Sequence, residues 1–212
     1  MNLYIYCEGQ TEESFVKSLL APHFLNYNIY TIPIICRTKE GPNSIHKGGI
    51  VDYTKAVKEI RRLCYQHQQE YVTSFIDYYG LHNLPPITAT NNKYSLIASI
   101  EQQFMTDVSN NNFIPYISLH EFESLLFSDP NAFSYLSTTA VSMLKKILED
   151  FDNNPEMINN SVTTAPSKRI QNLIANYGKV TDGNMIANSI TLNVIRQKCI
   201  HFNNWLSILE KI

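Results

Sequence analysis

Acidic residues stand at or directly after the ends of three apolar segments that we expect to be strands. In chain order, these acids are Glu8, Asp77, Glu121 and Glu123. A carboxylate at the end of a buried strand is costly unless it is paired, hydrogen-bonded or bound to a cation. Three strand ends with acids therefore favour a shared divalent cation. Oxygen ligands without a His or Cys pattern favour Mg²⁺ or Mn²⁺ over Zn²⁺.

The residues behind Glu8 allow two interpretations each. Gly9 lets a backbone N–H approach a ligand closely, as at phosphate sites near helix N-termini. Glu12 lies on the helical turn nearest Glu8, so we weigh it equally as a second metal ligand and as a first-turn acid that complements the helix dipole. We interpret Glu13 as such a first-turn acid. The alternative for Glu8 itself is a strand-end acid paired with Lys or Arg.

The stretch HEFESLLF at residues 120–127 carries the last two acids. In an α-helix, Glu121 and Glu123 would lie about 200° apart around the axis, so both cannot face one site. We expect one of them to be a surface acid or a residue that supports the ligands from behind. His120 either orients a carboxylate, transfers a proton or is a structural hydrogen-bonding residue.

These residues require a sheet that places its strand ends side by side. Strand-like and helical segments alternate up to about residue 130, which predicts an α/β core (residues 1–130) with a central sheet of mostly parallel strands flanked by helices. Such sheets bind ligands outside the carboxyl ends of their strands, where the strand order reverses. Residues 131–212 are mostly helical, and we expect a C-terminal extension that packs on the core.

The expected elements follow from hydrophobic periodicity and from helix and turn signals. Pro33 makes the second strand an edge strand or a short one. We expect strands at 3–7, 28–36, 70–77 and 112–119, helices at 11–24, 51–68, 93–108 and 120–127, and loops at 37–49 and 78–86.

Composition indicates a globular protein. The 212 residues are 44% hydrophobic and 11% aromatic, and the net charge of -2 gives no global basicity that would point to nucleic acid. The four cysteines show no paired spacing, and no apolar run reaches transmembrane length, so we expect reduced thiols, a cytoplasmic location and no membrane partner. A Walker A pattern and a G-x-S-x-G motif are both absent, so any ATPase activity would belong to a partner, and an α/β-hydrolase is disfavoured.

Four blocks of sequence together resemble the DUF4276 family. The blocks are YCEGQTEESFV, TSFIDYYGL, SLHEFESLLFSDP and APSKRI…YGKVTDG…VIRQKCIHFNNWL. They cover most of the chain, and their combination is specific although each alone is weak. That family is similar to a divergent branch of the TOPRIM fold, which occurs in topoisomerases, bacterial primases and OLD-type nucleases. The resemblance implies a metal-binding carboxylate site for phosphodiester chemistry.

The resemblance assigns roles to the acids of the first half. The TOPRIM pattern has a glutamate after the first strand, which Glu8 matches, and OLD-type members add a second glutamate four residues on, which Glu12 matches. Asp77 matches the first acid of a D-x-D motif, but Tyr79 stands where the second aspartate is expected. This departure bears on whether a full two-metal site exists.

In the second half, the resemblance favours Glu123 over Glu121, because a later glutamate of the family lies in an F-E-x-L-L context. OLD-type nucleases also use a late lysine, for which Lys168 in PSKR is the candidate. The implied metal ligands are therefore Glu8, Glu12, Asp77 and Glu123, and the implied catalytic residues are Glu8, Asp77, Glu123 and Lys168. Relatives of this kind are often encoded beside ABC-type (SMC-like) ATPases in anti-phage defence loci.

A carboxylate site that cleaves nucleic acid needs cations nearby to offset its repulsion of phosphates. The candidate phosphate-binding residues are Gly9, Lys47, Lys168 and Arg169, with Lys179 as a further cation. The alternative for each basic residue is a solvated surface position. Tyr78 and Tyr79 either stack on a base or sugar or pack over the sheet edge.

The leading interpretation is a metal-dependent nuclease that acts on DNA or RNA, the effector subunit of a bacterial anti-phage system. One alternative is a TOPRIM-like subunit that has lost catalysis and docks on an ABC-type ATPase, an interpretation that Tyr79 suggests. Another is phosphotransfer or phosphatase action on a nucleotide.

Overall fold

The computed structural model describes residues 1–212 except 42–43, 48–50, 88–89 and 160, and the side chains of residues 37–50 and 162 also lie outside the described part. The chain divides into two compact units, Met1–Leu119 with Ile212, and His120–Lys211. This division falls earlier than the change of sequence pattern near residue 130.

The first unit is built on a parallel sheet. Its strands are β1 (Asn2–Cys7), β2 (Tyr30–Ile35), β6 (Tyr71–Asp77) and β8 (Phe113–Ile114), with β9 (Ile117–Ser118) beside the end of β6. The order is β2-β1-β6-β8 and each of these neighbouring pairs is parallel, which confirms the predicted α/β class. Strand β2, which contains Pro33, is an edge strand, as predicted.

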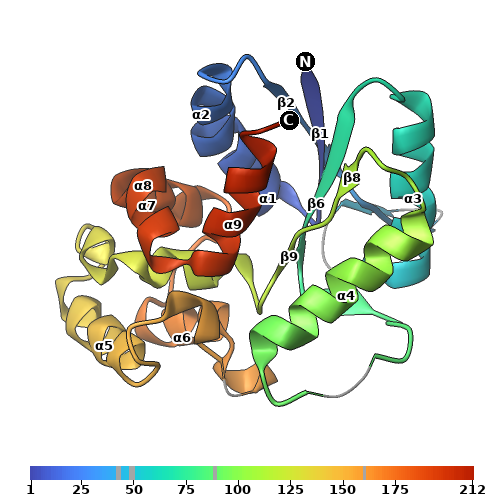
Figure 1. The fold of residues 1–212 in the computed structure, drawn as a ribbon. Coiled ribbons are helices and arrows are strands. Elements are labelled where there is room, and N and C mark those ends of the chain that lie inside the picture. Colours follow the sequence, from blue (N-terminus) through green and yellow to red (C-terminus); the bar gives the residue numbers. More distant parts are fainter. Residues whose placement is uncertain (42–43, 48–50, 88–89, 160) are drawn as a thin grey trace. The chain divides into compact units, whose positions relative to one another are not determined.

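Helices cover both faces of this sheet. They are α1 (Gln10–Phe15), a π-helical segment (Val16–Leu20), α2 (Ala21–Leu25), α3 (Tyr53–Gln66) and α4 (Lys93–Val108). Figure 1 shows α1 and α2 on one side of the strands and α3 and α4 on the other. The chain passes from β1 to β2 in one direction along the sheet and from β2 past β1 to β6 in the other. The strand order therefore reverses at β1 and β6, and their carboxyl ends flank the switch point.

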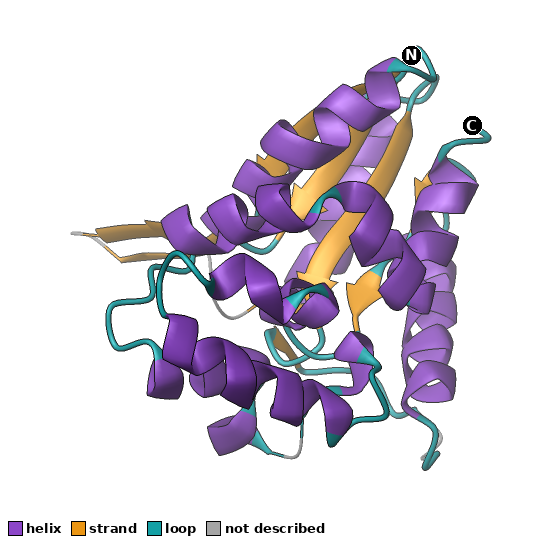
Figure 2. Cartoon of the chain, turned by 90° about the vertical axis from the view of Figure 1, so that its left-hand side faces the viewer, coloured by secondary structure: helices purple, strands orange, loops and turns teal. Residues whose placement is uncertain are grey.

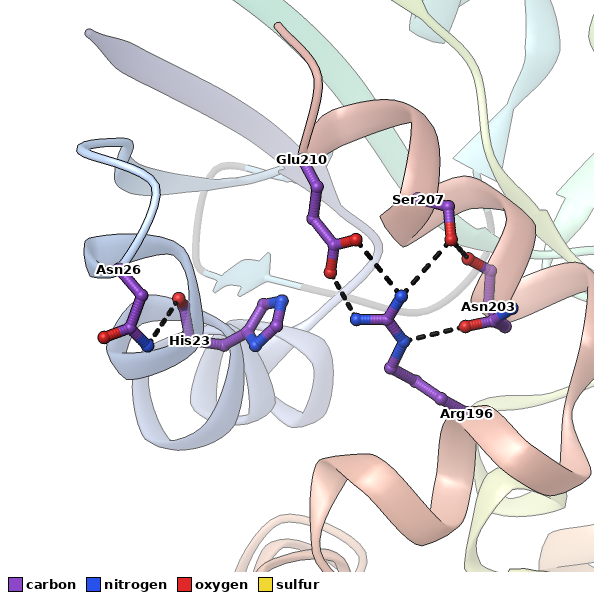
Figure 3. Close-up of polar contacts among 6 residues, drawn as sticks. All are labelled: His23, Asn26, Arg196, Asn203, Ser207 and Glu210. Carbon is purple, nitrogen blue, oxygen red and sulfur yellow. Dashed lines mark hydrogen bonds and ion pairs between the residues drawn. The ribbon is translucent and has the colours of Figure 1, made fainter.

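The first helical stretch runs without a break from Gln10 to Leu25 through its π-helical segment. There the N–H of Ala21 donates to the carbonyl oxygen of Val16, five residues back. Pro22, the next residue, has no N–H to continue the α-helical ladder, which accounts for the wider turn. At the end of α2, the side-chain amide of Asn26 donates to the carbonyl of His23 (3.1 Å; Figure 3).

The loop predicted at 37–49 is wrong for residues 37–41 and 44–47, and its residues 42–43 and 48–49 lie outside the described part. Strands β3 (Arg37–Gly41) and β4 (Ser44–Lys47) pair antiparallel there, separate from the parallel sheet (Figure 2). Gly, Pro and Asn are common in loops and in hairpins alike, so composition alone cannot separate the two. The predicted loop at 78–86 likewise contains the short strand β7 (Leu81–His82), which pairs with β5 (Val51–Asp52).

The single strand predicted at 112–119 is also wrong, because β8 and β9 are separate short pieces. Pro115 between them has no N–H for a ladder. The backbone of Tyr116 bonds instead to the side chain of Ser74, whose hydroxyl accepts from the Tyr116 N–H (2.9 Å) and donates to its carbonyl (3.0 Å). The segment after it is not the predicted α-helix but the 3₁₀-helix η2 (Phe122–Ser128).

The second unit is helical in the part of the chain that the structure describes. Its elements are η2, η3 (Pro130–Phe133), α5 (Thr138–Glu149), η4 (Pro155–Met157), η5 (Val162–Thr164), α6 (Pro166–Leu173), α7 (Thr181–Ile190), α8 (Leu192–Lys198) and α9 (Ile200–Leu209). Leu126, Phe127 and Phe202 are fully buried in its core. In the ranges that the structure describes, no helix combines the length and apolar character that crossing a membrane requires.

Two polar networks fix the last helices of this unit. The buried carboxylate of Glu156 accepts from the N–H groups of His201 (3.0 Å) and Phe202 (2.9 Å), in the first turn of α9. Arg196 of α8 donates to Asn203 of α9 (2.7 Å) and forms an ion pair with Glu210, the residue directly after α9 (Figure 3). Helix α8 is thereby joined to α9 and the residue after it through polar side chains.

Candidate functional site

The sheet brings Glu8 and Asp77 together at its switch point. Strand β1 pairs with β6 with Cys7 opposite Phe75, and the ladder continues as the Glu8 N–H donates to the Phe75 carbonyl (3.2 Å). The Glu8 side chain reaches across the end of β6, where its Oε2 accepts from the backbone N–H of Asp77 (3.1 Å). Asp77 itself is buried. Two of the predicted ligands therefore share one sheet edge.

Gly80 shapes the space around the Glu8 carboxylate. A Cβ atom at Gly80 would lie 2.2 Å from Oε2 and 2.5 Å from the carboxyl carbon of Glu8. Real Cβ contacts are not this short, so any other residue would displace the carboxylate. Sequence reasoning missed Gly80, although a glycine three residues after a strand-end aspartate was a signal for a close approach.

Ser118 adds a polar group beside Asp77. The two residues are paired across β9 and β6, so their side chains lie on the same face of the sheet. The Ser118 hydroxyl is buried and has no hydrogen-bond partner among the described residues. A buried hydroxyl without a partner is costly unless a ligand or water satisfies it. Sequence reasoning missed Ser118 because it considered only the acids that follow the predicted strand and not the serine near its end.

The structure gives Gly9 and Glu12 a capping role. Gly9 is the extended residue before α1, and its N–H donates to Oε2 of the buried Glu12 (2.8 Å). A capping box has two bonds, one accepted by the side chain of the first residue and one by the side chain three residues on. Glycine has no side chain, so only the bond from the Gly9 N–H to the Glu12 side chain can form here. A ligand at the Gly9 N–H would compete with Glu12. Glu13 forms a surface ion pair with Lys17 (2.7 Å), in keeping with its interpretation as a first-turn acid.

In the second unit, Glu121 and Glu123 have different partners. Glu121, just before η2, accepts from the N–H of Ser167 (3.0 Å) in the first turn of α6. Glu123 is 2% exposed and forms an ion pair with Lys179 (3.2 Å). Burial raises the pKa of Glu123; Lys179 opposes this shift and Glu121 adds to it.

The same cluster extends to an aromatic hydroxyl. The Tyr177 hydroxyl is buried without a hydrogen-bond partner in the described ranges. Burial raises its pKa, and the charge of Glu123 adds to the shift. Glu121 thus contacts the backbone of the PSKR segment and Glu123 pairs with Lys179, both within the second unit.

The remaining predicted residues have local surroundings. His120 is buried, and its Nδ1 lies 3.2 Å from the side-chain amide nitrogen of Asn159. Lys168 is exposed and lies 3.4 Å from the Gln171 side-chain oxygen. Arg169 donates to the carbonyl of Thr164 (2.7 Å), a contact that fixes its guanidinium to its own segment. Lys47 ends β4, but its side chain lies outside the described residues.

The Glu8 and Asp77 pair fits a hard cation of the Mg²⁺ type. No three His, Cys, Asp or Glu side chains gather as a closed cage in the described ranges. Mg²⁺ does not need one, because it keeps several waters and is usually bound through one or two carboxylates and substrate phosphates. Gly80 accommodates the Glu8 carboxylate, which packs against it, and the Ser118 hydroxyl lies beside Asp77. The donor set is therefore suitable for an open site.

The fold and these residues define an α/β protein in which a glutamate and an aspartate lie at the ends of neighbouring parallel strands, at the switch point of the sheet. The chain belongs to the family described as "Domain of unknown function (DUF4276)", which it matches over residues 7–210. No curated protein and no solved structure matches it significantly.

Proposed function

We propose that the chain is a metal-dependent nuclease with a TOPRIM-like core, acting in the cytoplasm as the effector of an anti-phage system beside an ABC-type ATPase. The observation that carries the proposal is the contact between the Glu8 carboxylate and the backbone of Asp77 at the switch point. Ligands of open parallel sheets bind at such points. The family resemblance supplies phosphodiester cleavage as the chemistry.

In this proposal, Glu8 and Asp77 hold Mg²⁺ or Mn²⁺. A bound ion of this type supplies charge neutralisation and lowers the pKa of water. The backbone N–H of Asp77 holds the Glu8 carboxylate in its orientation. The absence of a side chain at Gly80 lets the Glu8 carboxylate pack directly against it, and Ser118 offers a hydroxyl beside Asp77. These residues bind and orient, which is the protein's main share in phosphoryl chemistry.

The resemblance assigns roles to three further residues. Glu12 and Glu123 would be metal ligands, and Lys168 would be a catalytic lysine. Glu12 has the weakest case, because its carboxylate caps α1.

A second function is favoured by one observation, the tyrosine at position 79 in place of an acid. A core that had lost catalysis would serve as a docking subunit for the ATPase. It would then bind its partner but cut no substrate.

The test is cleavage of labelled DNA and RNA with Mg²⁺ or Mn²⁺ by the wild-type chain, Glu8→Ala and Asp77→Ala. Glu13→Ala is the matched control, because Glu13 is an acid of the same segment that pairs at the surface with Lys17. We expect cleavage by the wild type and the control only. Equal activity of all four proteins would contradict the proposal.

Metal binding has a readout that does not depend on cleavage. Mn²⁺ should raise the melting temperature of the wild type and of Glu13→Ala, and should raise it much less in Glu8→Ala, because binding to the folded state alone stabilises it. An equal shift in all three proteins would place the ion elsewhere.

A further inference from the structure

Lys93 lies in an unusual contact at the same edge of the sheet. Its ammonium nitrogen is 3.4 Å from the centre of the Tyr78 ring. Lys93 is the first residue of α4, and α4 begins at the end of the sheet where β6 stops (Figure 1). Sequence reasoning assigned no role to Lys93.

Tyr78 ties this lysine to the candidate site. It follows Asp77 directly, and its N–H donates to the carbonyl of Ser118 (3.1 Å), which continues the pairing of β6 with β9. The Tyr78 ring also contacts Tyr79, with the ring centres 6.0 Å apart. One face of Tyr78 is covered by the ammonium group, so that face cannot stack on a base.

The surroundings of Lys93 favour an anionic ligand. The side chain is half-buried, and burial lowers its pKa to about 8. Within the described ranges no carboxylate is paired with it. An aromatic face attracts an ammonium ion but accepts no conventional hydrogen bond from it, so the donors of Lys93 stay available. The partial positive charge at the start of the 16-residue helix α4 also favours an anion there.

We propose that Lys93 is a phosphate-binding residue of the site and that Tyr78 is the positioning residue that holds it. Its ligand is a backbone phosphate of the nucleic acid whose neighbouring phosphate lies at Glu8 and Asp77. The inference rests on the proposed function and adds the cation that an acidic site needs to bind a polyanion.

The test is binding of a fluorescein-labelled single-stranded DNA oligonucleotide in Ca²⁺, measured by anisotropy over a range of salt concentrations. The variants are Lys93→Met, Lys93→Arg and the matched control Lys58→Met, since Lys58 is an exposed lysine on α3 of the same unit. We expect Lys93→Met to raise Kd roughly tenfold and to reduce the slope of log K against log salt by about 0.7. Lys93→Arg and Lys58→Met should retain affinity and slope.

Tyr78 variants separate positioning from general packing. Tyr78→Phe keeps the ring face and should bind as the wild type does. Tyr78→Leu removes it and should weaken binding as Lys93→Met does, because the ammonium group loses its support. Equal binding by the two variants would contradict the role of the ring.

Protection from acetylation tests the contact in the wild-type chain, so it does not depend on the folding of a variant. The oligonucleotide should slow acetylation of Lys93 several-fold and leave Lys58 unchanged, as measured by mass spectrometry. An unchanged Kd for Lys93→Met, no protection of Lys93, or no binding by the wild type overturns the inference. Binding that depends on Lys93 without any cleavage leaves the inference standing and rejects only the nuclease.

Discussion

The two acidic regions of the molecule hold their carboxylates by different means. In the first unit, the backbone of β6 holds Glu8 through the Asp77 N–H. In the second, Glu123 is almost wholly buried and depends on the side chain of Lys179. A backbone donor is fixed by the register of the sheet, whereas a lysine is held only by its own flexible chain.

This difference separates positioning from stability. The Glu8 carboxylate is held by the sheet and is only partly buried, so it keeps its place at little cost. A buried carboxylate paired with a lysine adds little net stability. Removal of the lysine is nevertheless strongly destabilising, because it leaves the carboxylate charge buried and unpaired. We therefore expect variants of the first region to change activity and variants of the second to change folding.

The largest effect is expected from Glu8→Gln and Asp77→Asn. Both keep the size of the side chain, and glutamine can still accept from the Asp77 N–H. Cleavage in Mg²⁺ should fall by about 100-fold or more, because the charge that binds the ion is lost. Melting temperatures without metal should stay close to that of the wild type. If the melting temperature fell in proportion to the activity, the effect would be on folding, and the proposed difference between the two regions would be wrong.

Removal of the lysine in the second region comes next. Lys179→Met should lower the free energy of unfolding by about 2 kcal/mol, less than for a fully buried pair because Lys179 is 43% exposed. Urea denaturation measures this. The double variant Lys179→Met/Glu123→Gln should recover most of the loss, since it buries no unpaired charge. If the double variant is as unstable as the single one, packing rather than charge explains the effect.

The same variant has a defined pH dependence. Burial raises the pKa of Glu123 above its ordinary value of 4.5. The stability that comes from the protonated form is present below the ordinary value and is lost as pH rises through the raised pKa. The cost of Lys179→Met should therefore be smallest near pH 4.5 and grow towards neutral pH, as denaturation at several pH values would show.

The sequence predicted the sheet well because strand and helix periodicity is local. Helix α4 was predicted at 93–108 and lies at Lys93–Val108, and β6 was predicted to within one residue. The error at 37–49 arose because loop and hairpin have similar composition, whereas the error at 112–119 involves non-local pairing. Whether Tyr116 joins a ladder depends on the Ser74 hydroxyl, which is far away in the sequence.

The residues of the candidate site differ in the same way: some are visible in the local sequence, and others matter only through contacts in the folded chain. Glu8 and Asp77 could be predicted because a carboxylate at a strand end is visible in the sequence. Gly80 gave only the signal of a glycine near a strand end, and Ser118 and Lys93 gave none, since the importance of these residues lies in a close approach, a buried hydroxyl and a ring contact. Each of these is a property of three-dimensional packing rather than of residue type.

Gly80→Ala is expected to act on activity through position alone. The added methyl group would meet the end of the Glu8 side chain, which can move, so stability should change little while cleavage falls about tenfold. Gly183→Ala is the matched control in the second unit, where the methyl group would lie 2.8 Å from the Tyr177 hydroxyl. It should lower the melting temperature and leave cleavage per folded molecule unchanged. The reverse pattern would contradict the proposed division of roles.

The smallest effect concerns Lys93 and folding. Its pKa is lowered from 10.5 to about 8, so between these values the unfolded chain binds the extra proton. This group therefore makes the wild type more stable as pH rises through that range, and the contribution is lost as pH falls below about 8. Lys93→Met should remove this rise, measured as free energies of unfolding at pH 7.5 and 9.5, by less than about 1 kcal/mol because solvent screens a half-buried group. Lys58→Met should keep the wild-type dependence. If Lys93→Met also keeps it, the ammonium group is not desolvated in solution, and its contact with Tyr78 reflects surface packing rather than a cation held for an anion.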